Sequence, residues 1–202
     1  LLTRPSTRTG PPLTAAALDG LLLTPDQANS AMGVTGLTVD KTATTMDDDT
    51  DNVSDQACLA MNNAADATVY AGSGFSAMRE QELLAGPPPH LVEQAVVLFS
   101  SAHDADAFFT ASSRSWPACA NRQYTDTSGG QPLQIMVGPV SNTNGTLSAT
   151  LNASFDGTPI IGERVLTVAN NVVIDIATAN ASAPGAALKI ARQIADKVSK
   201  AS

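Results

Sequence analysis

Cys58 and Cys119 are the only two cysteines in this 202-residue chain. Neither has another cysteine or a histidine within a few residues, so their spacing excludes a C-x-x-C zinc or redox site. Two arrangements remain, a single structural disulfide or two free thiols, and the isolated positions favour the disulfide. Such a bridge would indicate an oxidising compartment, and closing so long a loop would stabilise the fold by about 4 kcal/mol.

Length and composition predict a single domain and argue against nucleic acid and anionic membranes as partners. A chain of 202 residues is long enough for one domain with a hydrophobic core. The net charge of -8 and the lack of a Lys/Arg cluster oppose binding to nucleic acid or to an anionic membrane surface. Aromatic residues make up only 4% of the chain, so aliphatic side chains must build most of the core. No apolar run reaches the roughly 18 residues that a membrane-spanning helix needs.

The start of the chain differs in composition from the rest. Residues 1–12 are rich in Pro, Gly, Ser and Thr, which predicts a flexible N-terminal tether, and residues 13–202 form a single predicted domain. The chain begins with Leu1 instead of Met, so we expect an upstream segment: a membrane helix, a signal peptide or a lipid-bearing residue. The domain would meet a membrane only through that N-terminal anchor.

Hydrophobic periodicity and turn residues predict the secondary structure. Helices are expected over residues 13–23, 24–33, 101–114 and 185–199, and strands over 35–46, 67–70, 75–84, 92–99, 133–140, 147–155, 164–169 and 172–177. Thr24 and Gln27 have the spacing of a capping box at a helix start. Asn170-Asn171 predicts a tight hairpin, because Asn tolerates positive φ. These elements predict an α+β fold, in which helices pack against an antiparallel β-sheet.

The acidic segment after the first predicted strand resembles a calcium loop only in part. Asp47, Asp49 and Asp51 have the first three spacings, but the sixth position is Asn52 and the twelfth is Cys58. A calcium loop requires Gly and Glu at those two positions. We therefore interpret the segment as a solvated acidic loop, with weak calcium binding as the alternative.

Candidates for catalysis are few. A hydrolase could use Ser73, which lies between two glycines, with His90 or His103 as the base. No G-x-S-x-G pattern, third triad member or oxyanion motif accompanies Ser73, and neither histidine lies in a recognisable motif. We therefore expect no catalytic residue, no metal and no cofactor.

Polar residues interrupt the apolar faces of three predicted strands. Arg79 and Gln81 share a face with Leu83, Gln94 lies among valines and leucine, and Asp175 shares a face with Val173 and Ala177. Such side chains must either pair internally or line a wet cleft. The first interpretation predicts a buried pair such as Arg79 with Asp175, and the second makes all four ligand-binding candidates.

Two aromatic residues join the candidates for the cleft. Tyr70 and Trp116 each combine a large apolar ring with a polar tip, which suits a cavity wall. The alternative is an ordinary place in the core. The full set of candidate ligand-binding residues is therefore Tyr70, Arg79, Gln81, Gln94, Trp116 and Asp175.

Several segments distributed over residues 13–200 carry a resemblance to a known family. They are Leu21-Leu-Leu-Thr-Pro-Asp-Gln, Met46-Asp-Asp, Val69-Tyr-Ala-Gly-Ser-Gly-Phe, Arg79, Gln81, Gln94-Ala-Val-Val, Trp116, Cys119, Val168-Ala-Asn-Asn-Val-Val-Ile-Asp, Gln193-Ile-Ala and Lys197-Val. Their order and spacing resemble the extracellular sensor domain of the mycobacterial PknH-type receptor serine/threonine kinases. The same domain is found in stand-alone exported lipoproteins.

The resemblance implies a non-catalytic sensor with an antiparallel sheet, packed helices and a cleft for an unidentified extracellular ligand. It also implies an extracytoplasmic location and a disulfide between Cys58 and Cys119, which would be one of two bridges in the family. The second cysteine pair is replaced here by Gly162 and Ala179. The hairpin around Asn170 is therefore expected to rely on strand pairing and packing.

Two binding functions remain open at this point, beside the hydrolase as the weaker alternative. In the first, the domain senses a small-molecule or cell-envelope ligand for a membrane receptor kinase, and a ligand that prefers the homodimer brings two kinases together. In the second, it is a lipoprotein that binds an envelope molecule without signalling. The segment upstream of Leu1 distinguishes them, because a kinase would supply a membrane helix and a lipoprotein would supply a lipid-bearing cysteine.

Overall fold

A computed structural model describes residues 10–202 and shows an α+β fold. Within these residues the sheet has nine antiparallel strands in the order β1-β2-β3-β9-β8-β7-β5-β4, with β6 paired to β7. The strands are β1 (Thr38–Ala43), β2 (Ala77–Ala85), β3 (His90–Leu98), β4 (Gln123–Asp126), β5 (Leu133–Val137), β6 (Ser141–Thr143), β7 (Thr146–Phe155), β8 (Thr158–Ala169) and β9 (Val172–Ala179).

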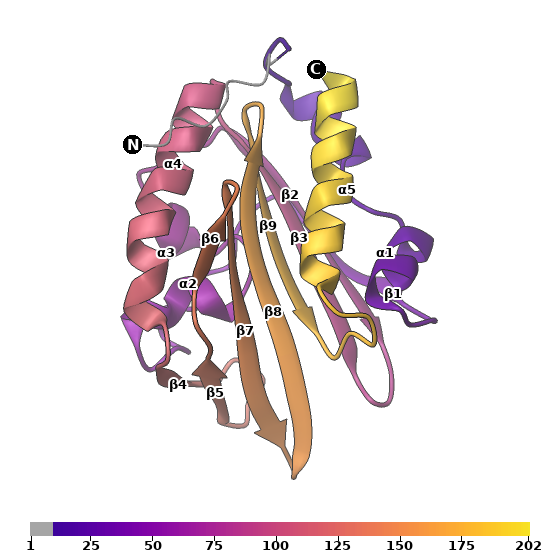
Figure 1. Ribbon diagram of the computed structural model, residues 1–202, viewed down its shortest axis with the longest axis vertical. Coiled ribbons are helices and arrows are strands. Elements are labelled where there is room, and N and C mark those ends of the chain that lie inside the picture. Colours follow the sequence, from indigo (N-terminus) through magenta and orange to yellow (C-terminus); the bar gives the residue numbers. More distant parts are fainter. Residues whose placement is uncertain (1–9) are drawn as a thin grey trace.

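Helices cover both faces of this sheet, which confirms the predicted architecture (Figure 1). The 3-10 helices are η1 (Ala15–Gly20), η2 (Gln56–Cys58) and η3 (Trp116–Cys119), and the α-helices are α1 (Pro25–Met32), α2 (Leu59–Asn62), α3 (Ala67–Tyr70), α4 (Ala102–Ser115) and α5 (Ala186–Ala201). Of the helices that the structure describes, none is long and apolar enough to cross a bilayer.

The sheet separates two hydrophobic cores. On the side that we call the α4 face, the strands pack against α2, α3 and α4; on the α5 face they pack against η1, α1 and α5. Side chains of β3 alternate between them, with Ala95 and Val97 in the first core and Val92 and Val96 in the second. A polar side chain on either face of β3 is therefore buried.

Local sequence signals locate most elements correctly. Thr24 accepts a hydrogen bond from the Gln27 backbone N–H, and the Gln27 side chain accepts one from Thr24, so the capping box is confirmed. The predicted helix over residues 13–23 is reduced to the 3-10 helix η1, and strand β4 was not predicted.

The predicted strand over residues 67–70 is wrong, because these residues form helix α3. The carboxylate of Asp66 accepts hydrogen bonds from the backbone N–H groups of Thr68 and Val69. This N-cap satisfies two of the free amides at the helix start. It outweighs the β-propensity of the Thr-Val-Tyr sequence, which is the signal that misled the prediction.

The β8–β9 hairpin turns at Asn170 and Asn171, as predicted, and only the first of these two has positive φ, 48°. The buried Asn171 amide accepts a hydrogen bond from Leu13 and donates to the carbonyls of Leu13 and Phe99. At the open end of the hairpin, Gly162 and Ala179 are direct cross-strand partners. The two positions that the resemblance assigns to a second cysteine pair thus lie opposite each other.

Part of the predicted N-terminal tether lies outside the described residues, which begin at Gly10. The described part contacts the hairpin, because the Asn170 side-chain amide donates to the carbonyls of Gly10 and Pro11. The C-terminal Ser202 hydroxyl accepts from the same amide group. The two ends of the domain therefore meet at the tip of the hairpin.

Cys58 and Cys119 form a disulfide, which confirms the predicted bridge. Both side chains are fully buried, and the bond joins η2 to η3 on the α4 face, with 61 residues of sequence separation. It therefore ties the segment that follows the acidic loop to the end of α4.

Removing this bridge should destabilise the domain. Replacing both cysteines by serine is expected to lower the free energy of unfolding by about 4 kcal/mol, because the unfolded chain regains the entropy of a long loop. Urea unfolding followed by the fluorescence of Trp116 measures the change. Wild-type protein treated with a reductant is the control, and a loss below about 1 kcal/mol in both samples would contradict the expectation.

Candidate functional site

The sheet divides the six predicted site residues into two groups of three. Tyr70, Trp116 and Asp175 lie on the α4 face, and they line one small cavity together. Arg79, Gln81 and Gln94 lie on the α5 face. They share a face of β2 and β3 with side chains of the core on that side, such as Val96. A cleft lined by all six residues is therefore not formed.

The three residues on the α5 face connect β2 and β3 to the segment that contains η1 and the start of α1. The fully buried Gln94 amide donates to the Leu23 carbonyl and to Gln81, and its oxygen accepts from the Leu23 N–H. Arg79 forms an ion pair with the exposed Asp19 of η1. These contacts attach the η1–α1 segment to β2 and β3.

The predicted pair of Arg79 with Asp175 is wrong, because the partner of Asp175 is Arg164. These two side chains are 1% and 3% exposed, and a guanidinium nitrogen lies 2.8 Å from Asp175 Oδ1. Arg164 lies two and four residues before Leu166 and Val168, so all three side chains point to the same face of β8. Leu166 and Val168 belong to the core on the α4 face, so the strand period predicts that Arg164 is buried there too. The predicted strand starts at Arg164, which makes this residue the end of a strand, whereas β8 begins six residues earlier, at Thr158.

Arg164 is held by groups from several elements. Its guanidinium donates hydrogen bonds to the carbonyls of Ala60 in α2 and Ile176 in β9. Its central carbon lies 5.6 Å from the ring centroid of the buried Trp116, which is a cation–π contact. A buried guanidinium requires such a complete set of partners.

Asp175 is bound by α3 and by the segment that precedes it. Its Oδ2 accepts hydrogen bonds from the Ala65 N–H and the Tyr70 hydroxyl, both at 3.0 Å. Burial raises the pKa of Tyr70 well above its usual value, and the Asp175 carboxylate adds to this shift. Oδ1 makes the ion-pair contact with Arg164 but has no hydrogen bond in residues 10–202, so this oxygen keeps acceptor capacity.

Residues 63–66 form a strap across the α4 face, and carboxylates hold it. Ala64 donates to Glu93, Ala65 donates to Asp175, and the Asp66 carboxylate accepts from the backbone of Asp49. Ala65 has positive φ, 51°, which a non-glycine residue adopts only where the surroundings fix it. The strap therefore depends on the buried acids beneath it.

Glu93 lies directly opposite Glu82 in the β2–β3 ladder, on the α4 face. Burial raises the pKa of Glu93 from 4.5 to about 8, and the carboxylates of Glu80 and Glu82 add to the shift, whereas the Ala64 N–H and Arg164 oppose it. Burial also raises the pKa of Glu80 from 4.5 to about 7. Like charges directly opposite each other destabilise a ladder, so the folded domain favours a protonated Glu93 near neutral pH.

A groove of about 410 Å³ runs along α4 and faces α3 and the turn that follows it. We call it the α4 groove; its lining residues are Val69, Ala71, Gly72, Ser73, Asp104, Ala107, Phe108, Ala111, Ser112 and Ser115. Its size falls in the range of small-molecule sites.

A smaller cavity of about 10 Å³ lies between this groove and the Arg164–Asp175 pair. Val69, Phe108 and Ser112 line both spaces, so these three side chains alone are shared by the groove and the inner cavity. Tyr70 stacks on Phe108 with ring centroids 4.2 Å apart, which fixes the inner wall. The small cavity thus lies behind the inner wall of the groove and borders the buried ionic centre.

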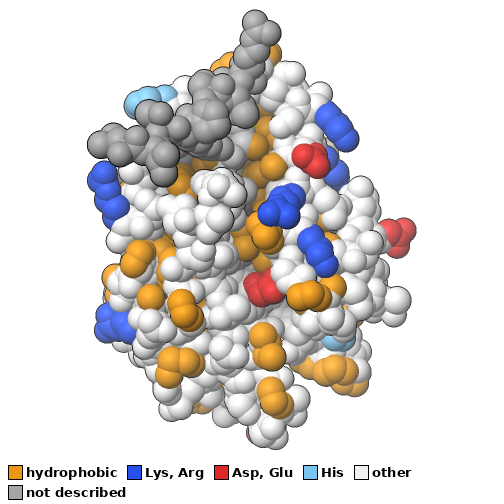
Figure 2. Space-filling model, in the orientation of Figure 1, with side chains coloured by type: hydrophobic (Ala, Val, Ile, Leu, Met, Phe, Trp, Pro, Cys, Tyr) orange, Lys and Arg blue, Asp and Glu red, His pale blue; other side chains and the backbone are white. Residues whose placement is uncertain are grey.

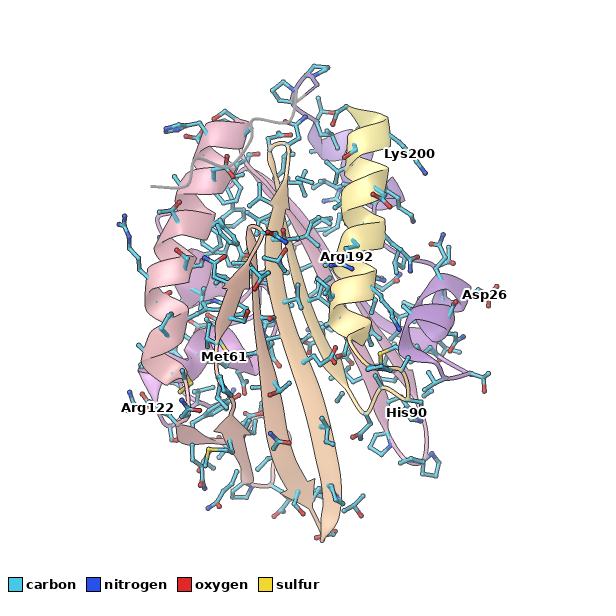
Figure 3. All side chains as sticks on the ribbon, in the orientation of Figure 1. Asp26, Met61, His90, Arg122, Arg192 and Lys200 are labelled. Atoms are coloured by element: carbon cyan, nitrogen blue, oxygen red, sulfur yellow. A yellow bond between two sulfur atoms is a disulfide. The ribbon has the colours of Figure 1, made fainter. Side chains whose placement is uncertain are left out.

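The hydrolase hypothesis gains no support from the geometry. The Ser73 hydroxyl has no hydrogen-bond partner in the described chain, so neither histidine contacts it. His90 approaches the Asn180 carbonyl instead and lies across the molecule from α4 (Figure 3), whereas the exposed His103 lies beside Asp104. Ser73 faces the α4 groove without a base.

The acidic loop is exposed at Asp47, Asp48 and Asp51, in agreement with a solvated loop, whereas Asp49 is buried. Asp47 pairs with Lys41, and the buried Asp49 carboxylate accepts from the side-chain amides of Asn52, Asn62 and Asn63. In residues 10–202 no group of three acidic, His or Cys side chains is arranged to hold a metal ion. The loop thus supports the strap.

Comparison with known proteins identifies the family. The model of the PknH-like extracellular domain matches residues 13–197. This chain belongs to the PknH-like extracellular domain family. The serine/threonine-protein kinases PknH of Mycobacterium bovis and Mycobacterium tuberculosis H37Rv are each 30% identical to it over 193 residues, which is 94% of this chain. The chain spans about a third of those kinases, 32% and 30% of their lengths.

A solved structure supports the same assignment. The crystal structure of the extracellular domain of PknH from Mycobacterium tuberculosis superposes with a TM-score of 0.86 and 30% identity. The match covers 94% of this chain and 98% of that one. The fold implied by the resemblance is thus confirmed over nearly the whole PknH-like domain.

The two arginine ion pairs should differ strongly in their effect on stability. Asp175→Asn is expected to lower the free energy of unfolding by about 3–5 kcal/mol, because it leaves Arg164 charged and buried without its counter-ion. Arg79→Gln, the matched control, breaks a solvent-exposed pair and should cost about 1 kcal/mol or less. Urea unfolding of both variants measures the difference, and equal losses would contradict it.

Stability should also depend on the proton held by Glu93. The pKa of Glu93 is raised from 4.5 to about 8 in the folded state. The proton on Glu93 therefore stabilises the fold fully below pH 4.5, and this stabilisation is lost as the pH rises to about 8. We expect wild-type stability to fall by roughly 3 kcal/mol between about pH 5 and about pH 8, and Glu93→Gln to reduce this slope. Asp156→Asn makes the same charge change at an exposed site; if it flattens the slope equally, the assignment to Glu93 is wrong.

Proposed function

We propose that this PknH-like domain is the extracytoplasmic sensor of a membrane receptor serine/threonine kinase, and that it binds its ligand in the α4 groove. The domain itself is non-catalytic in this proposal. The observation that carries it is a solvent-open groove that shares three lining side chains with the small cavity beside a buried ionic centre, and this centre holds a strap in place. The similarity to kinases over the full domain supports the kinase context above the stand-alone lipoprotein.

Signalling follows from the way the groove is built. One wall is α3 with its following turn, which the strap positions, and the other is α4. A ligand that contacts both walls stabilises one separation of them and so shifts the population of domain shapes. If the favoured shape pairs with a second receptor, mass action brings two kinases together. An N-terminal anchor upstream of this chain would carry the change to the membrane.

A groove-filling variant tests the location. Ala111 is exposed and lines the middle of the groove, so Ala111→Phe should fill it without disturbing the core. The neighbouring Thr110 is also exposed but does not line the groove, so Thr110→Phe adds the same ring elsewhere on α4. Fractions of a cell-envelope extract are added to each protein, and the melting temperature is measured.

We expect an active fraction to raise the Tm of the wild type and of Thr110→Phe by roughly 5 °C, and that of Ala111→Phe by much less. Equal responses of the two variants would place the ligand outside the α4 groove. If no fraction stabilises the wild type, the proposal of an envelope ligand fails.

A further inference from the structure

We propose that the α4 groove selects a ligand without negative charge, whose end donates a hydrogen bond to the buried Asp175 Oδ1. Both an ammonium and an alcohol or sugar hydroxyl have this chemistry. The inference rests on the proposed function, because it names the ligand class of the same groove.

The cavity behind the groove wall offers an acceptor for a further hydrogen bond. Asp175 is 3% exposed and lines the inner cavity, and its Oδ1 makes the 2.8 Å ion-pair contact with Arg164 but accepts no hydrogen bond in the described part of the chain. A buried carboxylate oxygen gains free energy from each N–H or O–H that reaches it, whereas a second carboxylate or a phosphate would be repelled. The cavity volume of about 10 Å³ admits one hydroxyl or ammonium group and excludes a ring.

The positive charge of the centre is not free for an anion. Arg164 directs its nitrogens at the Ala60 carbonyl, the Ile176 carbonyl and Asp175, all within the protein. Asp66 also lines the inner cavity, and Asp104 lines the groove. With a net charge of -8 on the whole chain, the potential in the groove and the cavity disfavours a negatively charged ligand.

The groove itself suits an apolar chain with few polar groups. Most of its lining side chains are small or apolar, and Phe108 and Val69 form its inner wall. The Ser73 hydroxyl is buried and has no hydrogen-bond partner in residues 10–202, so it can bind one polar atom of the ligand. The groove thus offers apolar contact along its length, one hydroxyl in its wall and one carboxylate beyond its inner end.

Three probes with the same six-carbon chain separate the charge classes: hexylamine, which is an ammonium at neutral pH, hexan-1-ol and hexanoate. Each is titrated into the ¹⁵N-labelled domain, and the amide signals of Ser73 and Ala65 are followed by NMR. Ser73 reports the groove, and Ala65 reports the inner end because its N–H donates to Asp175. We expect saturable shifts of both signals with the amine and the alcohol, and at least tenfold weaker binding of hexanoate.

Two variants attribute the selectivity to the groove. Asp104→Asn removes a charge from the lining, so hexanoate should bind severalfold more tightly and hexylamine more weakly. Asp106→Asn makes the same change in the same helix away from the lining and should alter neither. Ser73→Ala, which leaves the buried ion pair intact, should weaken hexan-1-ol severalfold.

Hexanoate binding as tight as hexylamine binding overturns the inference and leaves the proposed function standing. Binding by none of the probes, or binding that Asp104→Asn and Asp106→Asn change equally, also overturns it. The proposed function fails separately, when no envelope fraction stabilises the wild-type domain.

Discussion

The buried ion pair between Arg164 and Asp175 joins more elements of this domain than any other polar contact described above. It connects β8 and β9 directly, reaches α2 through the Ala60 carbonyl, packs on Trp116 of η3, and holds the strap and α3 through Ala65 and Tyr70. Two charges in a protein interior are stable only when their remaining donors and acceptors are satisfied. The irregular chain between the acidic loop and β2 supplies those groups, so this segment has one required position over the sheet.

Strand periodicity was sufficient to predict that Asp175 needed an internal partner or a wet cleft, but not to identify that partner. Alternation assigns a residue to one of two faces, and it leaves open which strands are neighbours. Arg79 and Asp175 both interrupt apolar rows, yet the strand order puts those rows on opposite sides of the sheet. The register between β3 and β9 depends on contacts far apart in sequence, which single-segment patterns do not contain.

Capping residues decided the elements for which propensity was ambiguous. The Thr24 box predicted α1, because its two hydrogen bonds are local and independent of the rest of the fold. Asp66 is a similar local signal and was overlooked in favour of the β-branched residues after it. The strap and its contact with Glu93 could not be predicted. Glu93 comes to lie directly opposite Glu82 only when β2 and β3 pair. Cys58 and Cys119 fixed one long-range contact in advance.

That disulfide also restrains one end of the α4 wall of the groove. It ties η2 to η3, and η3 directly follows the Ser115 end of α4, so this end of the α4 wall is covalently joined to the segment that leads through α2 and the strap to α3. A helix that is restrained at one end has its greatest freedom at the far end. The far end is the start of α4, just after the Phe99 carbonyl that Asn171 binds together with Leu13. The end of α4 that the disulfide leaves unrestrained is thus the end beside the N-terminal segment of the domain.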